Sequence, residues 1–260
     1  MASKWSNTGA KRGREARADL GIAPDVPLDD LLTTIEEAGA HVVVLDLPEG
    51  VAGAYIAKPG CPLLFVNGDQ WIARQRFTLA HEFGHFRMGH ETVVDKQVAI
   101  SGYLHDPNEV CANAFAAEFL MPKLAIARWG RENVRGEPTL EHVCLLAAEY
   151  GVSAQAARYA LDTADVLTSF KRKSQLDDEI RQELHVELFK QLGLEPLEDE
   201  LAAASARRPR IPRTLRDTAL GDLLAGDIDT AGFAERVNAP TAQVDAMLAA
   251  LGLDQLLATA

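Results

Sequence analysis

Cysteine and long apolar runs are both scarce in this sequence of 260 residues. Its three cysteines, Cys61, Cys111 and Cys144, are odd in number and form no CxxC pair, which indicates thiols in a reducing compartment rather than a disulfide framework. No stretch reaches the about 20 apolar residues of a membrane-spanning helix, and the basic N-terminus precedes no apolar run of a signal peptide. We therefore expect a soluble, cytoplasmic protein without membrane contact.

Positive charge is also in deficit. Lys and Arg number 26 against 38 Asp and Glu, for a net charge of −12 at pH 7. Such a balance disfavours non-specific attraction to nucleic acid or to an anionic membrane. Apolar residues, in contrast, make up 47% of the chain, which is enough for a packed core. The length allows one large domain or, as we expect here, one domain with a helical appendage.

The spacing of apolar residues predicts both helices and strands. An amphipathic helix at 27–39 precedes three β-rich runs at 41–47, 51–57 and 63–67. A turn containing Pro and Gly joins the second and third runs, which predicts an antiparallel hairpin. Further helices are expected at 69–89, at 106–121, as two short pieces within 139–163, as a charged helix at 174–192, and as three short helices in the last 45 or so residues.

The helical segment at 69–89 contains the sequence HEFGH at 81–85. Residues i and i+4 share one helix face, so the imidazoles of His81 and His85 can reach the same metal ion. Glu82 lies about 100° around the helix, where its carboxylate can accept a proton from a water that zinc activates. A chance match on a solvated helix is the alternative. The apolar flanks instead predict a buried helix, in which unpartnered His and Glu side chains would cost several kcal/mol.

A catalytic zinc usually has three protein ligands, and the third is less clear from the residues alone. His90 does not fit, because Gly89 and His90 are both out of register with the pattern HExxHxxGxxH. Glu109 is a better candidate, although Asp106 and Glu109 also resemble a capping box, and spacing leaves these two interpretations equal. His105 and Cys111 are competitors for the third position. Asn113, one turn after Glu109, is expected to orient a ligand from outside the metal's own shell.

Two stretches together resemble the ImmA/IrrE family of bacterial metallopeptidases: RFTLAHEFGH at 76–85 and ExxANxFAAEFLMP at 109–122. The resemblance covers about residues 25–165. It implies that Glu109 is the third ligand of one zinc ion per chain, beside His81 and His85, with Glu82 as the catalytic residue. It also implies an endopeptidase that cleaves a protein partner, a helix-turn-helix transcriptional repressor, and so induces silenced genes in a stress response or in the control of a mobile element.

The fold that the resemblance implies is α+β: a minimal zincin domain, with a small antiparallel sheet and metal-bearing helices, followed by a helical C-terminal region. We expect the chain to divide as follows: a basic N-terminal arm at 1–24, the zincin metallopeptidase domain at 25–135, a helix-turn-helix-like element at 136–170, a charged helix at 171–203, a linker at 204–213 and an acidic helical module at 214–260. The arm is too short for the N-terminal DNA-binding module that many relatives carry.

Three further residues are candidates for stabilising an oxyanion or contacting substrate: Tyr55, Tyr103 and His105. Packing or a surface position is the plainer interpretation of each. An extended substrate could pair with the edge of the sheet, for which the strands at 53–57 and 63–67 are the candidates.

Direct DNA binding is not expected. The helix after Ser153 offers Arg158 but little other positive charge, and residues 214–260 contain two Arg against seven Asp and Glu, a charge of 2 − 7 = −5. A regulatory protein that binds its partner on a zincin fold without hydrolysis is the alternative function. The presence of Glu82 favours the enzyme, because a pure binder has no need of a general base. The acidic C-terminal helices are expected to dock a partner or to regulate the enzyme, with a purely structural cap as the alternative.

Overall fold

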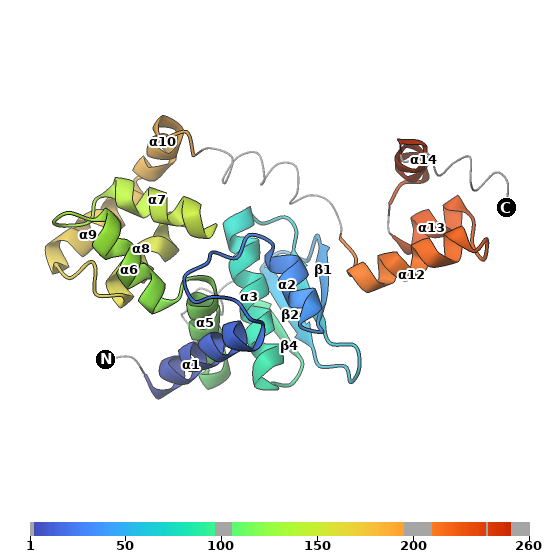
Figure 1. Ribbon diagram of the computed structural model, residues 1–260, viewed down its shortest axis with the longest axis horizontal. Coiled ribbons are helices and arrows are strands. Elements are labelled where there is room, and N and C mark those ends of the chain that lie inside the picture. Colours follow the sequence, from blue (N-terminus) through green and yellow to red (C-terminus); the bar gives the residue numbers. More distant parts are fainter. Residues whose placement is uncertain (1–2, 97–105, 195–209, 238, 251–260) are drawn as a thin grey trace.

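A computed structural model of the chain describes residues 3–96, 106–194, 210–237 and 239–250. A four-stranded sheet and the helices α3 (Ile72–Met88) and α5 (Pro107–Leu120) lie at its centre. Further helices lie to one side of this centre, and a separate group of three helices lies on the other (Figure 1). The α+β class and the helical C-terminal region are therefore as the sequence predicts.

The sheet has the strand order β1-β3-β2-β4, with β1 at His41–Leu45, β2 at Val51–Ile56, β3 at Leu63–Asn67 and β4 at Val93–Lys96. β2 and β3 form the expected antiparallel hairpin, and β4 pairs antiparallel with β2. β1, however, runs parallel to β3, so the expectation of a wholly antiparallel sheet is wrong. In the sheet β3 lies between β1 and β2. This order depends on tertiary packing, and the residue pattern within each strand does not determine it.

The two strands that we considered as a substrate-binding edge are not at an edge. Residues 53–57 and 63–67 fall on or next to β2 and β3, and each of these strands is paired on both sides. The edges of the sheet are β1 and β4 instead. Part of the β1 edge is covered, because Val44 and Arg210 exchange two backbone hydrogen bonds of 2.9 Å in an isolated antiparallel bridge.

Helix α3 packs on β2 and β3, and α5 packs on α3 from the other side. The contact between the two helices is aromatic: the ring of Phe83 lies 5.8 Å from that of Phe115 and 5.3 Å from that of Phe119, measured between centroids. All three side chains are completely buried. Gly84 permits this approach, because a Cβ there would lie only 3.0 Å from the ring of Phe115. The apolar flanks of the HEFGH motif therefore form the core of the domain.

The segment expected as a basic arm is a packed helix. Helix α1 (Lys4–Asp19) begins at the capping side chain of Ser3 and lies along α5. Gly9 and Gly13 allow the close approach: a Cβ on Gly9 would fall 2.1 Å from the carbonyl oxygen of Cys111. The guanidinium of Arg17 is buried and donates to the carbonyl oxygen of Phe119 at 2.7 Å.

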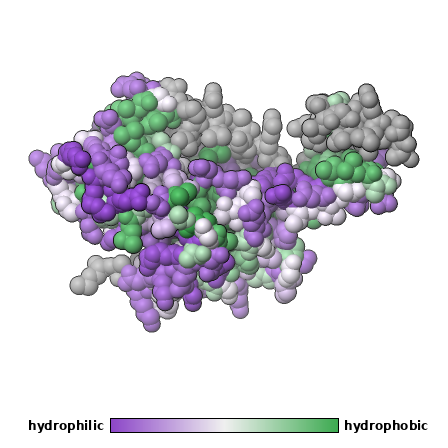
Figure 2. Space-filling view, viewed as in Figure 1, coloured by the Kyte–Doolittle hydropathy of each residue, from purple (hydrophilic) through white to green (hydrophobic). Residues whose placement is uncertain are grey.

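Five helices follow α5 and pack beside the sheet domain: α6 (Lys123–Asn133), α7 (Leu140–Tyr150), α8 (Ala154–Thr163), α9 (Phe170–Arg181) and α10 (Leu184–Gln191). The single charged helix expected at 174–192 is wrong, because Glu183 adopts a left-handed conformation with φ 58° and separates α9 from α10. Figure 2 shows an apolar area where α7 and α10 lie, and these helices carry the exposed Leu145, Leu184 and Val186.

The C-terminal lobe, defined as residues 210–237 and 239–250, consists of α12 (Arg213–Leu224), α13 (Thr230–Arg236) and α14 (Thr241–Ala250). It has an apolar cluster of its own, made by Ala219, Leu223, Phe233, Ala234, Val244 and Leu248. Polar contacts join it to the second helix and the first strand of the chain. Arg210 pairs with Glu36 of α2 (Leu31–Glu37) at 2.9 Å, and the backbone N–H of Arg213 donates to the same carboxylate at 3.1 Å.

Among the described residues, no single helix combines the length and the apolar character needed to cross a membrane. Helices α5 and α6, which are bent by 44° at their junction, have this length and apolar character only when taken together.

Candidate metal centre

The HEFGH motif lies on the most buried part of α3. His81, Glu82 and His85 have no solvent-exposed surface, and the residues around them from Thr78 to Gly84 are buried as well. Three ionisable side chains inside a core are costly unless each has partners. The position of the motif on a buried helix, as the sequence predicts, therefore demands an arrangement that satisfies these side chains.

Two imidazoles and one carboxylate converge at a single point between α3 and α5. The Nε2 atoms of His81 and His85 are 3.0 Å apart. Glu109 places Oε2 3.4 Å from Nε2 of His81 and Oε1 3.5 Å from Nε2 of His85. One possible ligand atom from each residue lies within 4.8 Å of the others, and all three residues are buried. The group could thus hold a metal ion.

Glu109 reaches this point because of its place in the first turn of α5. Asp106 caps the helix, and its carboxylate accepts hydrogen bonds from the backbone N–H groups of Asn108 at 2.8 Å and of Glu109 at 3.4 Å. In a capping box the side chain of Glu109 would turn back to the cap. Its two oxygens instead face the two histidines, so the carboxylate is directed into the core.

The outward-facing nitrogen of each histidine also has a partner. Nδ1 of His81 lies 3.0 Å from Oδ1 of Asn113, one turn after Glu109 on α5, which is the contact expected of an orienting residue. Nδ1 of His85 lies 2.9 Å from Nδ1 of His90. Sequence reasoning treated His90 only as a ligand that failed the spacing test and so missed this contact. Gly89, directly before it, was the available signal, because a glycine there ends the helix and turns the chain back.

Glu82 faces the sheet. A Cβ on Gly53 of β2 would lie 2.5 Å from Oε1 of Glu82 and 2.6 Å from Cγ2 of Thr78, so only glycine fits at this position of the strand. The carboxylate is therefore held between α3 and β2, next to the histidine pair on its own helix.

The remaining candidates fare differently. Tyr55, on β2, is buried with its ring edge-on to Phe86 at a centroid distance of 6.2 Å, and burial raises the pKa of its phenol, so it stays protonated. Cys111 faces α1, where its thiol donates to the carbonyl oxygen of Trp5 at 3.3 Å, away from the histidines. Tyr103 and His105 lie outside the described residues.

The donor set fits zinc. A tetrahedral ion with metal–ligand bonds of about 2.0–2.1 Å separates its ligand atoms by about 3.3 Å, and the three separations here are 3.0, 3.4 and 3.5 Å. Two imidazole nitrogens and one carboxylate are also the ligand types of many catalytic zinc sites. Three protein ligands would leave a tetrahedral ion a fourth position for water or substrate.

A comparison with known families agrees with this geometry. Residues 35–162 match the family described as the IrrE N-terminal-like domain. Residues 35–162 therefore form a domain of the ImmA/IrrE metallopeptidase family. The matched segment includes His81, Glu82, His85 and Glu109, whereas α1 and the C-terminal lobe lie outside it. No curated protein matches the chain.

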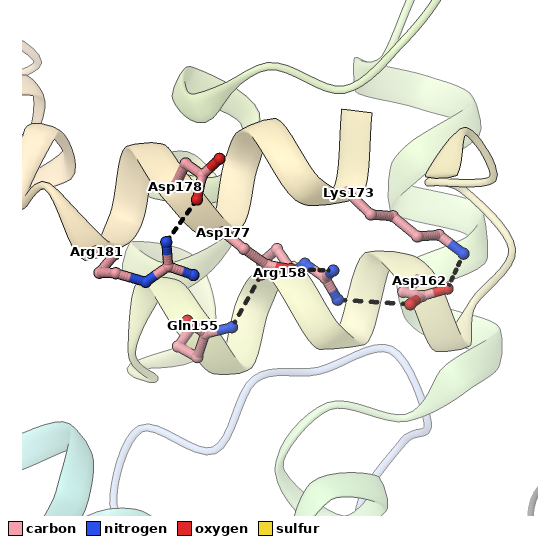
Figure 3. A network of polar contacts seen from close by, with 7 residues as sticks. All are labelled: Gln155, Arg158, Asp162, Lys173, Asp177, Asp178 and Arg181. Atoms are coloured by element: carbon pink, nitrogen blue, oxygen red, sulfur yellow. Dashed lines mark hydrogen bonds and ion pairs between the residues drawn. The ribbon is translucent and has the colours of Figure 1, made fainter. Parts of the chain in front are cut away.

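The family segment ends within a second polar cluster, which surrounds the buried Arg158 and joins α8 to α9 (Figure 3). Arg158, nearly inaccessible to solvent, pairs with Asp177 at 2.7 Å and with Asp162 at 3.4 Å. Lys173 contacts Asp162 at 2.6 Å, and the amide of Gln155 donates to Asp177 at 3.3 Å. Two cations and two carboxylates therefore balance each other. Arg158, which we considered as a DNA contact, forms its ion pairs within this cluster.

Proposed function

We propose that the protein is a zinc-dependent endopeptidase whose substrate is another protein, a helix-turn-helix transcriptional repressor. The observation that carries the proposal is the buried convergence of His81, His85 and Glu109 next to a fourth buried acid, Glu82. In this proposal the first three residues hold one zinc ion per chain. Cleavage of the repressor would induce the genes that it silences, in a stress response or in the control of a mobile element.

The residues divide the work of peptide hydrolysis between them. A bound zinc ion supplies a Lewis acid that polarises a peptide carbonyl and makes a water molecule more acidic. Glu82 takes the proton from the attacking water and delivers it to the nitrogen of the leaving amine. Asn113 holds the ring of His81 with Nε2 in the group that would hold the ion. Gly53 leaves the space in which the carboxylate of Glu82 sits.

The acidic segment 214–260, which includes most of the C-terminal lobe, favours a protein substrate over a small molecule. Residues 214–260 carry a charge of −5 by the count above, and DNA-binding repressors present basic surfaces. Opposite charge speeds such an encounter and orients the partners. The lobe has its own apolar cluster and meets the domain through polar contacts of Arg210 and Arg213. This arrangement favours a docking or regulatory module over a cap that only shields the domain's core.

DNA is not part of the proposed function. The helix that follows the turn at Gly151 and Ser153 is α8, and its Arg158 is buried against Asp162 and Asp177. A guanidinium in this position is not available to phosphates or base edges. The acidic charge of the whole chain acts in the same direction.

The alternative is a protein that sequesters the repressor without cutting it. It shares the partner with the first proposal but has no use for Glu82. Glu82 is fully buried on the helix that carries both histidines, where a general base would act on a metal-activated water, and this favours the enzyme.

The experiment combines the zinc-loaded protein with helix-turn-helix repressors encoded beside its gene. Intact mass spectrometry follows the repressor, and a mobility-shift assay follows its binding to DNA. The proposal predicts two fragments from one cleavage site with the wild type and none with Glu82→Gln. If the repressor instead loses DNA binding with the wild type and with Glu82→Gln alike, and no fragments form, the protein sequesters its partner without cutting it. If the repressors stay intact and DNA-bound, the assignment of the substrate is wrong.

A further inference from the structure

We propose that His90 is a positioning residue for the metal centre. Its Nδ1 accepts a hydrogen bond from Nδ1–H of His85 and so fixes the tautomer and the ring orientation with which His85 presents Nε2 to the metal. The inference rests on the proposed metal centre and adds to it a residue that is neither a ligand nor part of the HEFGH motif.

The two nitrogens of His85 face opposite environments. Nε2 faces the ligand group, 3.0 Å from Nε2 of His81 and 3.5 Å from Oε1 of Glu109. Nδ1 faces His90, 2.9 Å from its Nδ1. Two ring nitrogens at this distance share one proton between them, so one donates and the other accepts. A nitrogen that binds a metal offers its lone pair, which leaves the proton of His85 on Nδ1 and makes His90 the acceptor.

The turn at the end of α3 brings His90 back to His85. Gly89 ends the helix in the left-handed conformation with φ 69°, which residues with a Cβ rarely adopt. The backbone N–H of His90 then donates to the carbonyl oxygen of His85 at 3.1 Å. The two rings meet nearly edge-on, with centroids 4.9 Å apart and an angle of 71° between their planes. The turn at Gly89 thus brings the ring of His90 against the ring of His85.

A comparison with the other histidine supports this role. His81 has the same arrangement: Nε2 in the ligand group and Nδ1 3.0 Å from a neutral acceptor, Oδ1 of Asn113. That acceptor comes from α5, whereas His90 comes from the cap of α3 itself. The oxygen of an Asn side chain occupies about the position of Nδ1 in a His side chain. Asn is therefore the conservative replacement for His90, because an Asn side chain already serves as the acceptor for His81.

Two other roles for His90 give different expectations. A further metal ligand would direct a nitrogen at the ligand group, whereas Nδ1 of His90 meets the far side of the His85 ring, and the described residues that could jointly hold a metal are His81, His85 and Glu109. A packing role would depend on the shape of the ring and not on its acceptor. Variants with and without an acceptor separate packing from positioning.

The test measures metal affinity in the full chain, with Zn²⁺ in competition against a chromophoric chelator and with the absorption spectrum of the Co²⁺-substituted protein. His90→Leu keeps bulk but has no acceptor, and His90→Asn keeps the acceptor. His185→Leu is the matched control, because His185 is also half-buried and packs edge-on against a ring, that of Phe189, on α10. Thermal melts of the metal-free proteins report folding.

We expect His90→Leu to lower Zn²⁺ affinity by about 10–100-fold, as loss of such partners typically does, and to alter the Co²⁺ spectrum. His90→Asn should restore both to near the wild type, and His185→Leu should leave both unchanged. Wild-type Zn²⁺ affinity in His90→Leu overturns the inference. An equal loss of affinity in His90→Asn or in His185→Leu also overturns it. So does a loss of affinity that occurs only because the metal-free variant does not fold. Failure of the wild type to bind Zn²⁺ refutes the proposed metal centre itself, a result distinct from all of these.

Discussion

In the part of the chain that the structure describes, the polar cluster around Arg158 and the one around His81 and His85 differ in how their charges are completed. In the cluster between α8 and α9, Arg158 and Lys173 alternate with Asp162 and Asp177 at 2.6–3.4 Å. In the cluster between α3 and α5, two imidazoles and a carboxylate turn their lone pairs toward one point. The first cluster is neutral within the chain. The second gathers groups that could jointly hold a metal ion from outside the chain.

This difference separates a structural cluster from a functional one. Desolvated ion pairs hold helices together when the geometry is good, although they add little net stability over apolar packing. Converging lone pairs destabilise the core until a cation binds, and the binding energy then becomes folding energy. Burial alone does not distinguish the two cases, because Arg158, His81 and His85 are all nearly or fully inaccessible. The signs of the charges that meet are what distinguish them.

The largest effect is expected for Glu82→Gln. The amide cannot accept a proton, so hydrolysis of a true substrate should fall by about 10²–10⁴-fold. Zinc content should stay the same, because Glu82 is not in the ligand group. Cleavage rates and metal analysis of the same preparation measure both. A variant that cuts within tenfold of the wild-type rate would contradict the role of Glu82.

Glu109→Ala should weaken zinc binding by more than the about 10–100-fold that loss of an outer partner costs. The variant removes a ligand and leaves two imidazoles facing each other across 3.0 Å. Chelator competition gives the affinity, and the rise in melting temperature on adding zinc gives an independent measure, which should shrink in the variant. An unchanged affinity and an unchanged rise in melting temperature would mean that Glu109 is not a ligand and serves only in the first turn of α5. The third ligand would then be unassigned.

Arg158→Leu tests the other cluster. It leaves Asp162 and Asp177 without their shared partner, but both carboxylates are about one-third exposed and can regain water. We therefore expect a loss of about 1–3 kcal/mol in the free energy of unfolding, below the about 3–5 kcal/mol of a fully buried pair. Urea denaturation measures it. Zinc affinity should not change, and a parallel loss of zinc would show that the two clusters are coupled.

Lys173→Ala should have the smallest effect. Its ion pair with Asp162 joins two side chains that are 25% and 35% exposed, and pairs of this kind contribute less than about 1 kcal/mol. The contribution should also decrease as salt is added. Denaturation at low and high salt measures both. A loss equal to that of Arg158→Leu would mean that the whole cluster acts as one unit.

The local part of the metal centre is predictable from sequence. The i, i+4 spacing of His81 and His85 sets a common helix face whatever the rest of the chain does. Glu109 is different, because the choice between cap and ligand depends on how α5 packs against α3. His90 is harder still: its contact requires the left-handed turn at Gly89, and a search for ligands at fixed spacings passes over it.

The fold shows the same division. The hairpin and the helices that carry the motif follow from local patterns, whereas the parallel pairing of β1 with β3 depends on which strands become neighbours. Helix α1 was missed because the face that it packs against α5 is built on Gly9, Gly13 and Ala16, which give no large apolar periodicity. A close helix contact requires small residues there, and large apolar residues are what a pattern search detects.

Helix α1 has a consequence for what counts as the smallest autonomous folding unit. The family segment begins at residue 35 and so leaves out a helix that covers one side of α5, the helix that carries Glu109. A fragment cut at the family boundaries would expose the α5 backbone beside Cys111 and Phe119 to water, and the carbonyl oxygen of Phe119 would lose Arg17 as its donor. The evolutionary module is thus smaller than the physical one, and expression trials should begin upstream of Lys4.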